Sequence, residues 1–405
     1  MNITKPKNRS IKIIEKNIIN QLTLFDYNYF ETNKKTINRQ RISMTKNQAL
    51  TIEKKLIKTF TKNDPKPELA SIEKLKQNLE NNPNQISFID LFAGIGGIKI
   101  GLENAGFKSV FSNDFDKYCK ITFDYNFANN DKQNLSNHQL YFGDISQISN
   151  QQIPYAKMLA GGFPCQPFSI AGYRQGFEDQ KGRGNLFFEI IRIIKDKQPL
   201  AILLENVKNL QSHDQGKTLK IIYQELENLG YLITHKVMNA IEYGNIPQNR
   251  ERIYIVAFKE ERSFKKFQFP SKIPLTKSIA DCLEKKVDER FYYNNKPLFP
   301  RISSAIVKKN TLYQWRRKYV RENKNSLCPT LTANMGMGGH NVPIILDDYG
   351  IRKLTPKECA NFQGFPDDYQ LPKNLADSAL YKQFGNSVCI PVIKRIGDQI
   401  REALD

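Results

Sequence analysis

Cys165 lies between two prolines, directly after the apolar run 158–160 and the paired glycines at 161 and 162. Each proline fixes its own φ and restricts the residue before it, so the thiol is held on a stiff loop. An isolated cysteine is more often a small buried apolar residue than a reactive group. Here it opens the polar, glycine-containing run 166–185, which we expect to form a loop that closes over a substrate. We therefore predict that Cys165 is a nucleophile.

A glycine-rich turn stands ahead of this thiol and predicts a binding site for a nucleotide-like ligand. The sequence indicates a strand over residues 86–92, a tight turn over 93–97 and an amphipathic helix over 98–104. Small residues in such a corner let the backbone approach a ligand closely. Lys99 stands where the third glycine of the dinucleotide pattern would be, which disfavours a nicotinamide or flavin cofactor.

Acidic residues follow the next two predicted strands. Asp114 comes 20 residues after Gly94, at the end of a strand over 109–112, and Asp144 follows the strand that ends at residue 143. Taken singly, such residues are more often turn or cap residues. At successive strand ends they predict a nucleoside site, in which Asp114 binds a ribose diol and Phe115 stacks on an adenine.

Glu205 follows a fifth apolar strand, predicted over 200–204 after a helix over 186–197. The ligand crevice of an open parallel sheet lies at the carboxyl ends of its strands, so the glycine turn, Cys165 and Glu205 are expected on one rim. At that position Glu205 is either a solvated carboxylate or an acid with a shifted pKa.

Two further strands are predicted over 231–240 and 252–258, after a helix over 218–229. The eleven residues between them are too few for a helical crossover, so we expect the last strand to run antiparallel to its neighbour. Arg250 and Arg252 lie at the start of that strand. Surface arginines usually serve solubility, and this pattern alone does not make them catalytic.

Composition bounds the class of protein. The chain has 405 residues, of which 40% are hydrophobic, which suits one large domain and a smaller one. No apolar run is long enough for a membrane span and the start lacks a signal-peptide core, so we expect a cytoplasmic protein. The six cysteines and four histidines are scattered, which argues against a disulfide framework and a metal site.

The net charge of +20 is concentrated in two regions. Residues 1–84 hold 17 basic and 8 acidic side chains, residues 259–325 hold 18 and 7, and the rest of the chain is neutral. Two basic regions beside a neutral body indicate docking on a polyanion, although a general lysine bias is the simpler explanation. Helices predicted over 49–60 and 72–79 are either a DNA-binding helix-turn-helix or a coat on the main domain. Basic and aromatic residues alternate over 313–319, which suits phosphate and base contacts.

With these pieces on hand, the sequence resembles the DNA cytosine-5 methyltransferases in their bacterial modification form. Six motifs in the family's order carry the resemblance: DLFAGIGG at 90–97, PCQ at 164–166, ENV at 205–207, QNRER at 248–252, RKLTP at 352–356 and QFGNSV at 383–388. It implies a doubly wound, mostly parallel seven-stranded sheet that binds S-adenosylmethionine, with a final helix packed against the first motif. It also implies four parts: a basic extension over 1–84, a catalytic domain over 85–258, an inserted target-recognition domain over 259–345 and a return over 346–405.

The resemblance assigns chemistry to particular residues. Cys165 is expected to add to carbon 6 of a cytosine flipped out of duplex DNA, so that carbon 5 can take the methyl group. Glu205 is expected to engage N3 and the exocyclic amine, and Arg252, supported by Arg250, to hold the carbonyl oxygen. The residues implied around S-adenosylmethionine are Phe92, Ala93, Gly94, Ile95, Gly96, Gly97, Asp114, Phe115, Asp144, Ile145, Leu186 and Asn386. Phe115 departs from the tryptophan often found there, which alters the stacking strength.

The target sequence and the partners follow from the same resemblance. Residues 313–323 and 328–336 are similar to recognition regions for sites of the CCGG or CC-N-GG type, and related enzymes carry an N-terminal extension that represses their own operon. The expected partner is double-stranded DNA, with no membrane and no metal. A restriction endonuclease acting on the same site is a candidate partner, and we expect a monomer. Two alternatives stay open: a non-catalytic DNA-binding regulator and a tRNA cytosine-5 methyltransferase.

Overall fold

The computed structural model describes residues 85–128, 139–163, 186–337 and 341–405. Cys165, the loop expected over 166–185 and the helices expected within 1–84 lie outside the described residues. Within the described part of the chain, no helix is both long and apolar enough to cross a membrane.

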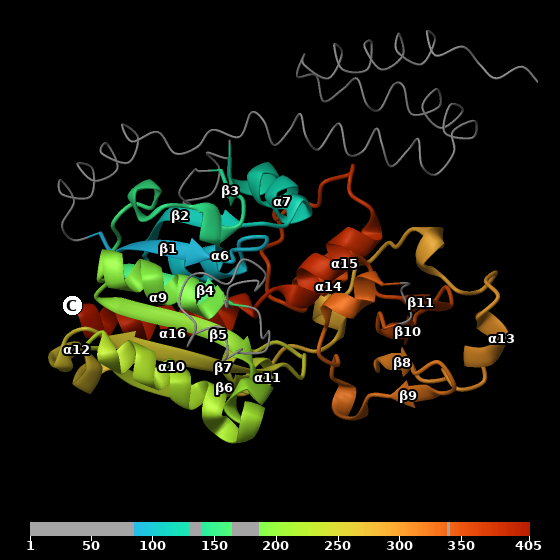
Figure 1. The fold of residues 1–405 in the computed structure, drawn as a ribbon. Helices are drawn as coiled ribbons and strands as arrows, with labels where there is room; N and C mark the ends of the chain where they lie inside the picture. Colours follow the sequence, from blue (N-terminus) through green and yellow to red (C-terminus); the bar gives the residue numbers. More distant parts are fainter. Residues whose placement is uncertain (1–84, 129–138, 164–185, 338–340) are drawn as a thin grey trace, which may run out of the picture. The chain divides into compact units, whose positions relative to one another are not determined.

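A seven-stranded sheet forms the larger part of the fold, in the order β3-β2-β1-β4-β5-β7-β6 (Figure 1). Its strands are β1 (Ser87–Leu91), β2 (Lys108–Asp114), β3 (Tyr141–Phe142), β4 (Met158–Gly162), β5 (Ala201–Val207), β6 (Leu232–Asn239) and β7 (Glu251–Phe258). The first five run parallel, and β7 is antiparallel to both β5 and β6. The expected doubly wound, mostly parallel sheet with an antiparallel last strand is therefore confirmed.

Alternating side chains of the strands bury both faces of this sheet. Along β5, Ile202 and Leu204 point to a cluster with α9 (Leu186–Lys197) and α10 (Lys217–Asn228). Leu203 points to the opposite cluster, which contains side chains of α6 (Gly97–Glu103) and α16 (Ile390–Leu404). Because successive side chains of a strand point to opposite faces, helices pack on both faces of the sheet and the fold has three layers. Helices α9 and α10 lie in front of the sheet in Figure 1.

The last helix of the chain packs on the first described one, as the resemblance implied. The contact is close because glycines face the partner helix: a Cβ on Gly101 would lie 2.6 Å from Cβ of Ile393, and one on Gly397 would lie 2.8 Å from Cβ of Ala105. Ile393 and Ile396 of α16 are fully buried against Leu102 of α6. The C-terminal segment therefore completes the face of the sheet that α6 begins to cover.

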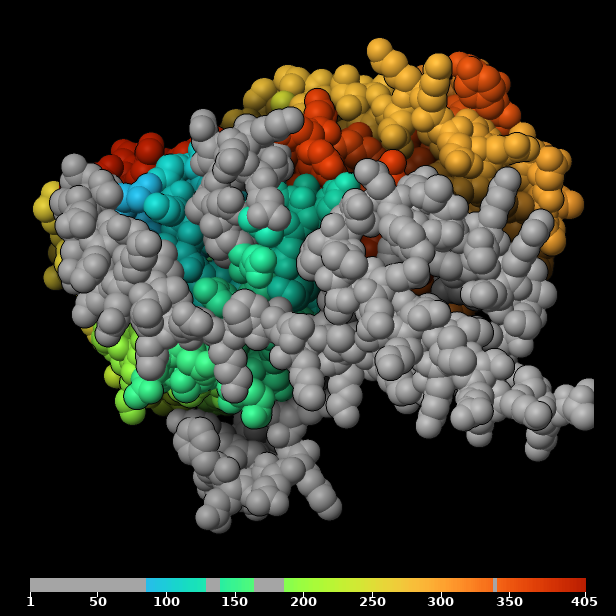
Figure 2. Space-filling model, turned by 90° about the horizontal axis from the view of Figure 1, so that it is seen from above, coloured from blue at the N-terminus to red at the C-terminus, as the bar shows by residue number. Residues whose placement is uncertain are grey.

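A second, four-stranded sheet follows in the order β11-β10-β8-β9, and all its pairs are antiparallel. Its strands are β8 (Tyr313–Trp315), β9 (Val320–Glu322), β10 (Ile344–Leu346) and β11 (Ile351–Lys353). Strand β11 lies beyond residue 345, so the sheet takes one strand from the segment expected to return to the catalytic domain. In the space-filling view from above, the orange surface of this region lies to the right of the blue and teal surface of the large-sheet region (Figure 2).

Among the described residues, six further α-helices lie between these strands or follow the last of them. They are α7 (Lys117–Phe127), α11 (Ala240–Gly244), α12 (Glu261–Lys266), α13 (Phe299–Ile302), α14 (Pro356–Asn361) and α15 (Asp377–Asn386). A shared apolar cluster joins the glycine turn, through Ile95, to Phe123 of α7 and to Phe362 and Phe384 near α14 and α15. The hydroxyl of Tyr369 also donates to the carbonyl of Ile95 at 2.8 Å. Residues of the C-terminal segment therefore pack against the glycine turn and stabilise it.

Candidate active site

Glu205 and Arg252 face each other across β5 and β7. The apolar run predicts Glu205 just after its strand, but β5 continues to Val207 and pairs Glu205 with Tyr254 of β7. Arg252 Nε lies 3.0 Å from Glu205 Oε1, and only 8% of the glutamate remains exposed. Antiparallel pairing thus brings a carboxyl group and a guanidinium together in a buried position.

Burial raises the pKa of Glu205, although the charges of Arg252 and Arg250 act to lower it. An acid of this kind keeps its proton at a higher pH than a solvated glutamate does. Glu205 can therefore donate a proton or a hydrogen bond, and Arg252 supplies a fixed positive charge beside it.

The carboxyl group also lies at the end of β4. A Cβ on Gly162 would be 3.5 Å from Glu205 Oε2, an ordinary contact distance, so the carboxyl group lies directly beside the end of β4. Asn206 donates from Nδ2 to the carbonyl of Phe163 at 2.9 Å. Phe163 is the last described residue before residue 164, so the chain leaves β4 next to Glu205. Cys165 itself lies outside the described residues.

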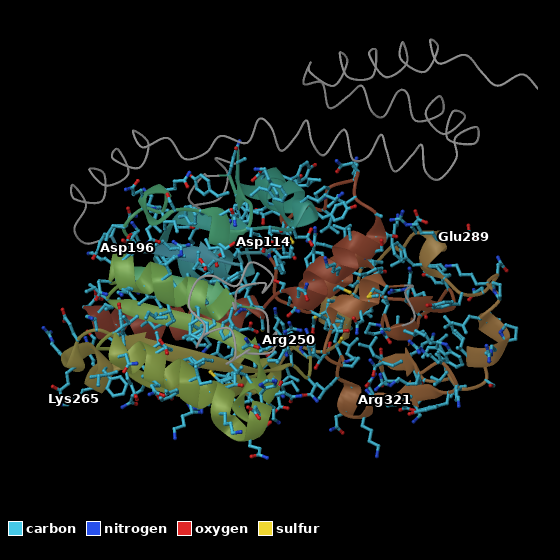
Figure 3. The ribbon with its side chains drawn as sticks, in the orientation of Figure 1. Asp114, Asp196, Arg250, Lys265, Glu289 and Arg321 are labelled. Carbon is cyan, nitrogen blue, oxygen red and sulfur yellow. The ribbon has the colours of Figure 1, made fainter. Side chains whose placement is uncertain are left out.

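Arg250 has different hydrogen-bond partners from Arg252, although the resemblance implied that the two arginines act together. Its Nη1 donates to the carbonyl of Leu331 at 2.8 Å, and Nη2 donates to the carbonyls of Gly385, at 3.3 Å, and Ser387. Arg250 is 2% exposed, and its Nε has no hydrogen-bond partner among the described residues. Burial, together with the charge of Arg252, lowers the pKa of Arg250 to about 9, so it stays charged at neutral pH. Figure 3 shows Arg250 between the large sheet and the segments that carry the second sheet.

The segment before Arg250 is tied to the strand-like segment around Cys328. The amide of Cys328 donates to the carbonyl of Pro247 at 2.7 Å, and the amide of Asn249 donates back to Cys328 at 2.8 Å. Gln248 accepts from the amide of Leu331 at 3.2 Å and donates to the carbonyl of Phe362 at 2.5 Å. Sequence reasoning missed this role of Gln248 and Asn249, because it depends on pairing across 80 residues of chain.

The glycine turn forms the second half of the rim. Gly94 and Gly96 have φ values of 56° and 83°, a region that side chains disfavour. The carboxylate of Asp114 accepts from the amides of Gly94, at 2.9 Å, and Asp116, at 2.8 Å. Burial raises the pKa of Asp114, while these amides act to lower it. The ring of Phe115 is 67% exposed beside it.

The other residues expected around the cofactor lie on several different elements. Asp144 is exposed and accepts from the amide and hydroxyl of Ser146, which is the cap role that the sequence left open, while Ile145 is buried. Leu186 is the first residue of α9, and Asn386 is the exposed last residue of α15. A Cβ on Gly97 would lie 2.6 Å from Oγ of Ser387, so the end of α15 touches the turn.

This rim has the chemistry of a nucleoside site. Among the described residues, a Cβ on Gly94 would meet no atom within 4 Å, so these residues leave open space next to the turn. A carboxylate, backbone amides and an exposed aromatic ring surround that space, and such groups suit a ribose, a polar ligand end and a purine. The residues present therefore fit an adenosine-containing cofactor.

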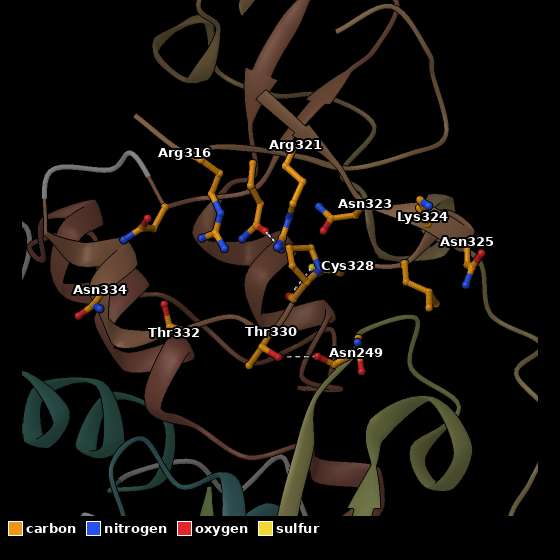
Figure 4. Close-up of a pocket in the computed structure, with 14 residues that line it drawn as sticks. Asn249, Arg316, Arg321, Asn323, Lys324, Asn325, Cys328, Thr330, Thr332 and Asn334 are labelled. Atoms are coloured by element: carbon orange, nitrogen blue, oxygen red, sulfur yellow. Dashed lines mark hydrogen bonds between the residues drawn. The ribbon is translucent and has the colours of Figure 1, made fainter. Parts of the chain in front are cut away.

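A pocket of about 580 Å³ lies between the start of β7 and the second sheet (Figure 4). Its lining contains three basic side chains, Arg316, Arg321 and Lys324, and no acidic one. The other lining residues are Asn249, Gln314, Asn323, Asn325, Leu327, Cys328, Pro329, Thr330, Thr332, Asn334 and Asn341. The sequence had indicated the segments 313–323 and 328–336 as a recognition region but not that Asn249 joins them.

Comparison with known proteins agrees with this geometry. The model of the C-5 cytosine-specific DNA methylase family matches residues 86–402. Type II methyltransferase M.Bsp6I of Bacillus sp. (strain RFL6) is 51% identical over 324 residues, covering 79% of this chain and 99% of the relative. Type II methyltransferase M.SsoII of Shigella sonnei is 37% identical over 394 residues, covering 91% and 97%.

The fold also matches solved structures. The Dnmt2 methyltransferase of S. pombe superposes with a TM-score of 0.58 at 19% identity, covering 79% of this chain and 99% of that chain. This likeness supports the fold alone. The family model and the curated relatives together show that the chain belongs to the C-5 cytosine-specific DNA methylases and is a DNA cytosine-5 methyltransferase.

Proposed function

We propose that this enzyme methylates carbon 5 of a flipped-out cytosine in a specific duplex DNA sequence, and so protects DNA in a restriction-modification system in the cytoplasm. The observation that carries the proposal is the buried pair of Glu205 and Arg252 at the carboxyl end of β4. Cytosine offers a ring nitrogen, an exocyclic amine and a carbonyl oxygen along one edge. A protonated carboxyl group and a guanidinium side by side complement that edge.

Glu205 activates the ring and Arg252 holds it. Burial raises the pKa of Glu205 and so favours its protonated form, which would donate to N3, while the other carboxyl oxygen accepts from the exocyclic amine. Arg252 donates to the carbonyl oxygen. As the ring gains electron density during nucleophilic attack, both interactions become stronger, which is how a site lowers the barrier to a reaction.

Cys165 supplies the electrons for the reaction. Its thiolate forms a bond to carbon 6, and the electron pair of the 5,6 double bond becomes available at carbon 5. S-Adenosylmethionine, when bound, would supply the methyl group that carbon 5 takes, and its methyl–sulfur bond would break to leave S-adenosylhomocysteine. A base then removes the proton from carbon 5, the double bond re-forms and the thiolate leaves carbon 6, so the enzyme is regenerated.

The glycine-turn rim is the proposed site for that cofactor. Asp114 would accept from the ribose hydroxyls and Phe115 would stack on the adenine, with Phe92, residues 93–97, Asp144, Ile145, Leu186 and Asn386 around them. The open space beside Gly94 and the exposure of Phe115 support this assignment.

Residues 259–345 are proposed to recognise the DNA sequence, at a site of the CCGG or CC-N-GG type, and the monomer would act beside an endonuclease for the same site. Residues 1–84 are proposed as an extension that binds upstream DNA and represses its own operon. M.SsoII is matched over 91% of this chain, and the unmatched remainder is smaller than these 84 residues, so the similarity extends into them. Loss of a footprint on upstream DNA after deletion of residues 1–70 would support this role; an unchanged footprint would contradict it.

The central test uses purified enzyme, labelled S-adenosylmethionine, duplex DNA and tRNA. We expect label in the duplex alone, mapped by bisulfite sequencing to the proposed sites, and a covalent adduct at Cys165 with a duplex that carries 5-fluorocytosine. The variant Cys165→Ser should form no adduct and transfer no methyl group. Transfer by Cys165→Ser, or preferential labelling of tRNA, would overturn the proposal.

A further inference from the structure

The hairpin of β8 and β9 has two chemically different faces. Tyr313 and Trp315 of β8 point into the apolar cluster of the second sheet and are 0% and 7% exposed. Gln314 lies between them in sequence, so its side chain points to the opposite face, where it is paired directly with Arg321 of β9. Arg316 continues the same face beyond the end of β8. The hairpin thus has an anchored apolar face and a polar, basic one.

The polar face is the wall of the pocket. Gln314, Arg316, Arg321 and Asn323 all line it, and Figure 4 shows the side chains of Arg316 and Arg321 extending from the hairpin into the space. A two-stranded ribbon of this kind fits the major groove of duplex DNA. The opposite wall contains Asn249, which is only three residues before Arg252, so the pocket adjoins the catalytic strand.

Arg321 is held in position by its strand partner. Its Nη2 donates a short hydrogen bond to Oε1 of Gln314, and Gln314 is only 8% exposed. A buried glutamine fixes the plane of the guanidinium, and the arginine then loses less side-chain entropy on binding. The remaining N–H groups of the fork match the two acceptors that guanine presents in the major groove, O6 and N7.

We propose that Arg321 is a specificity-determining residue that reads one guanine of the target site from the major groove, with Gln314 holding its guanidinium in place. The inference deepens the proposed recognition role of residues 259–345 and rests on it. Both site types proposed above contain guanine, so a guanine reader next to the catalytic strand suits either of them.

The experiment compares methyl-transfer rates on duplexes in which each position of the site carries each of the four bases. We expect Arg321→Ala to lose about 5- to 150-fold of the discrimination at one guanine position, the range for one bidentate arginine–guanine contact. The matched control is Lys318→Ala, an exposed residue of the same hairpin's turn. It should slow methylation of every sequence by a similar factor, as loss of a phosphate contact does.

A second measurement uses modified DNA with the wild-type enzyme. Replacing one guanine by 7-deazaguanine removes the N7 acceptor and preserves base pairing. At the guanine read by Arg321, this change should slow the wild-type enzyme but have no further effect on Arg321→Ala. Unchanged discrimination at every position in Arg321→Ala, or equal sensitivity of both enzymes to each 7-deazaguanine, would overturn the inference. Failure of the wild-type enzyme to methylate any duplex would instead overturn the proposed function.

Discussion

Two buried arginine–carboxylate centres in this enzyme are built differently. In the large sheet, Arg252 meets Glu205 through one contact at 3.0 Å, and burial raises the pKa of the glutamate. Near the second sheet, Arg352 donates from Nη1 and Nη2 to both oxygens of Glu358 at 2.8 Å, and from Nε to Asp347 at 2.6 Å. Burial acts against the charge on Arg352, yet these bonds raise its pKa.

The carboxylates account for the difference. Glu358 also accepts from the amides of Thr355, at 2.8 Å, and Glu284, at 3.0 Å, and forms a capping box at the start of α14. Four donors therefore bind Glu358, whereas Glu205 keeps capacity for a further partner. A fully hydrogen-bonded ion pair holds segments together, and an incompletely bonded one is available for a substrate.

The largest expected effect comes from removing Arg352, whose guanidinium is bonded to the carboxylates of Glu358 and Asp347. Replacing Arg352 by alanine leaves the buried charge of Glu358 without its partner, so the free energy of unfolding should fall by about 3–5 kcal/mol. Urea denaturation followed by circular dichroism measures this change. A loss below about 1 kcal/mol, typical of an exposed pair, would remove the distinction between the two centres.

A substitution in the Glu205–Arg252 pair should lower the activity of the enzyme rather than its stability. Glu205→Gln keeps the shape of the side chain but cannot donate a proton to N3, so the single-turnover rate of methyl transfer should fall about 10²- to 10³-fold. Its unfolding midpoint in urea should stay close to that of the wild type. A variant with normal turnover, or one that unfolds like Arg352→Ala, would contradict the assignment.

The pH dependence sharpens the same point. Because burial raises the pKa of Glu205, the protonated acid persists above the ordinary value of 4.5. The rate that depends on this proton should be full below the raised pKa and fall about tenfold per pH unit above it. Single-turnover profiles of the wild type and of Glu205→Gln measure the effect, and the variant should lack this decline. A decline of equal size in both would assign it to another group.

A smaller effect is expected at Arg250. Its Nη atoms donate to three backbone carbonyls, and its Nε has no hydrogen-bond partner among the described residues. Lysine keeps the charge but cannot reach the carbonyls of Leu331, Gly385 and Ser387 together, so Arg250→Lys should lower the free energy of unfolding by about 1.5–3 kcal/mol. Urea denaturation provides the measurement. A variant as stable as the wild type would show that these carbonyl contacts do not hold the segments together.

The smallest effect belongs to an exposed pair on the same two strands. Lys208 follows β5 and contacts Glu251 of β7 at 2.9 Å, with both side chains about half exposed. Lys208→Ala should change the free energy of unfolding by at most about 1 kcal/mol. Its denaturation curve serves as the baseline for the three buried variants. A larger loss of unfolding free energy would mean that closeness to the Glu205–Arg252 site, rather than burial, determines how much a charged side chain contributes to stability.

Local patterns in the sequence predicted the large sheet well. The apolar period gave α9 with its observed bounds, and the short link before residue 252 gave the antiparallel strand. The second sheet escaped prediction because β8 pairs with β10 across about thirty residues, and three-residue strands carry little periodicity. The position of Glu205 within β5, rather than after it, likewise depends on its pairing with Tyr254 of a later strand.

The candidate site was predicted as residue types and not as contacts. Motif order assigned roles to Glu205 and Arg252, which stay predictions, and the structure adds that the two side chains form an ion pair. Nothing local distinguishes Arg250 from Arg252, because the carbonyls that Arg250 binds belong to residues 81 or more positions away. The cap at Asp144 is local by contrast, because its partner Ser146 lies two residues away.

The packing of α16 on α6 has a consequence for synthesis. Ile393 and Ile396 cover apolar surface on a helix that is made about three hundred residues earlier. A ribosome-bound chain therefore cannot bury that surface until α16 has left the exit tunnel, and Leu102 and Phe107 stay exposed or chaperone-bound until then. The face of the large sheet that α6 begins to cover is thus complete only after α16 has been made.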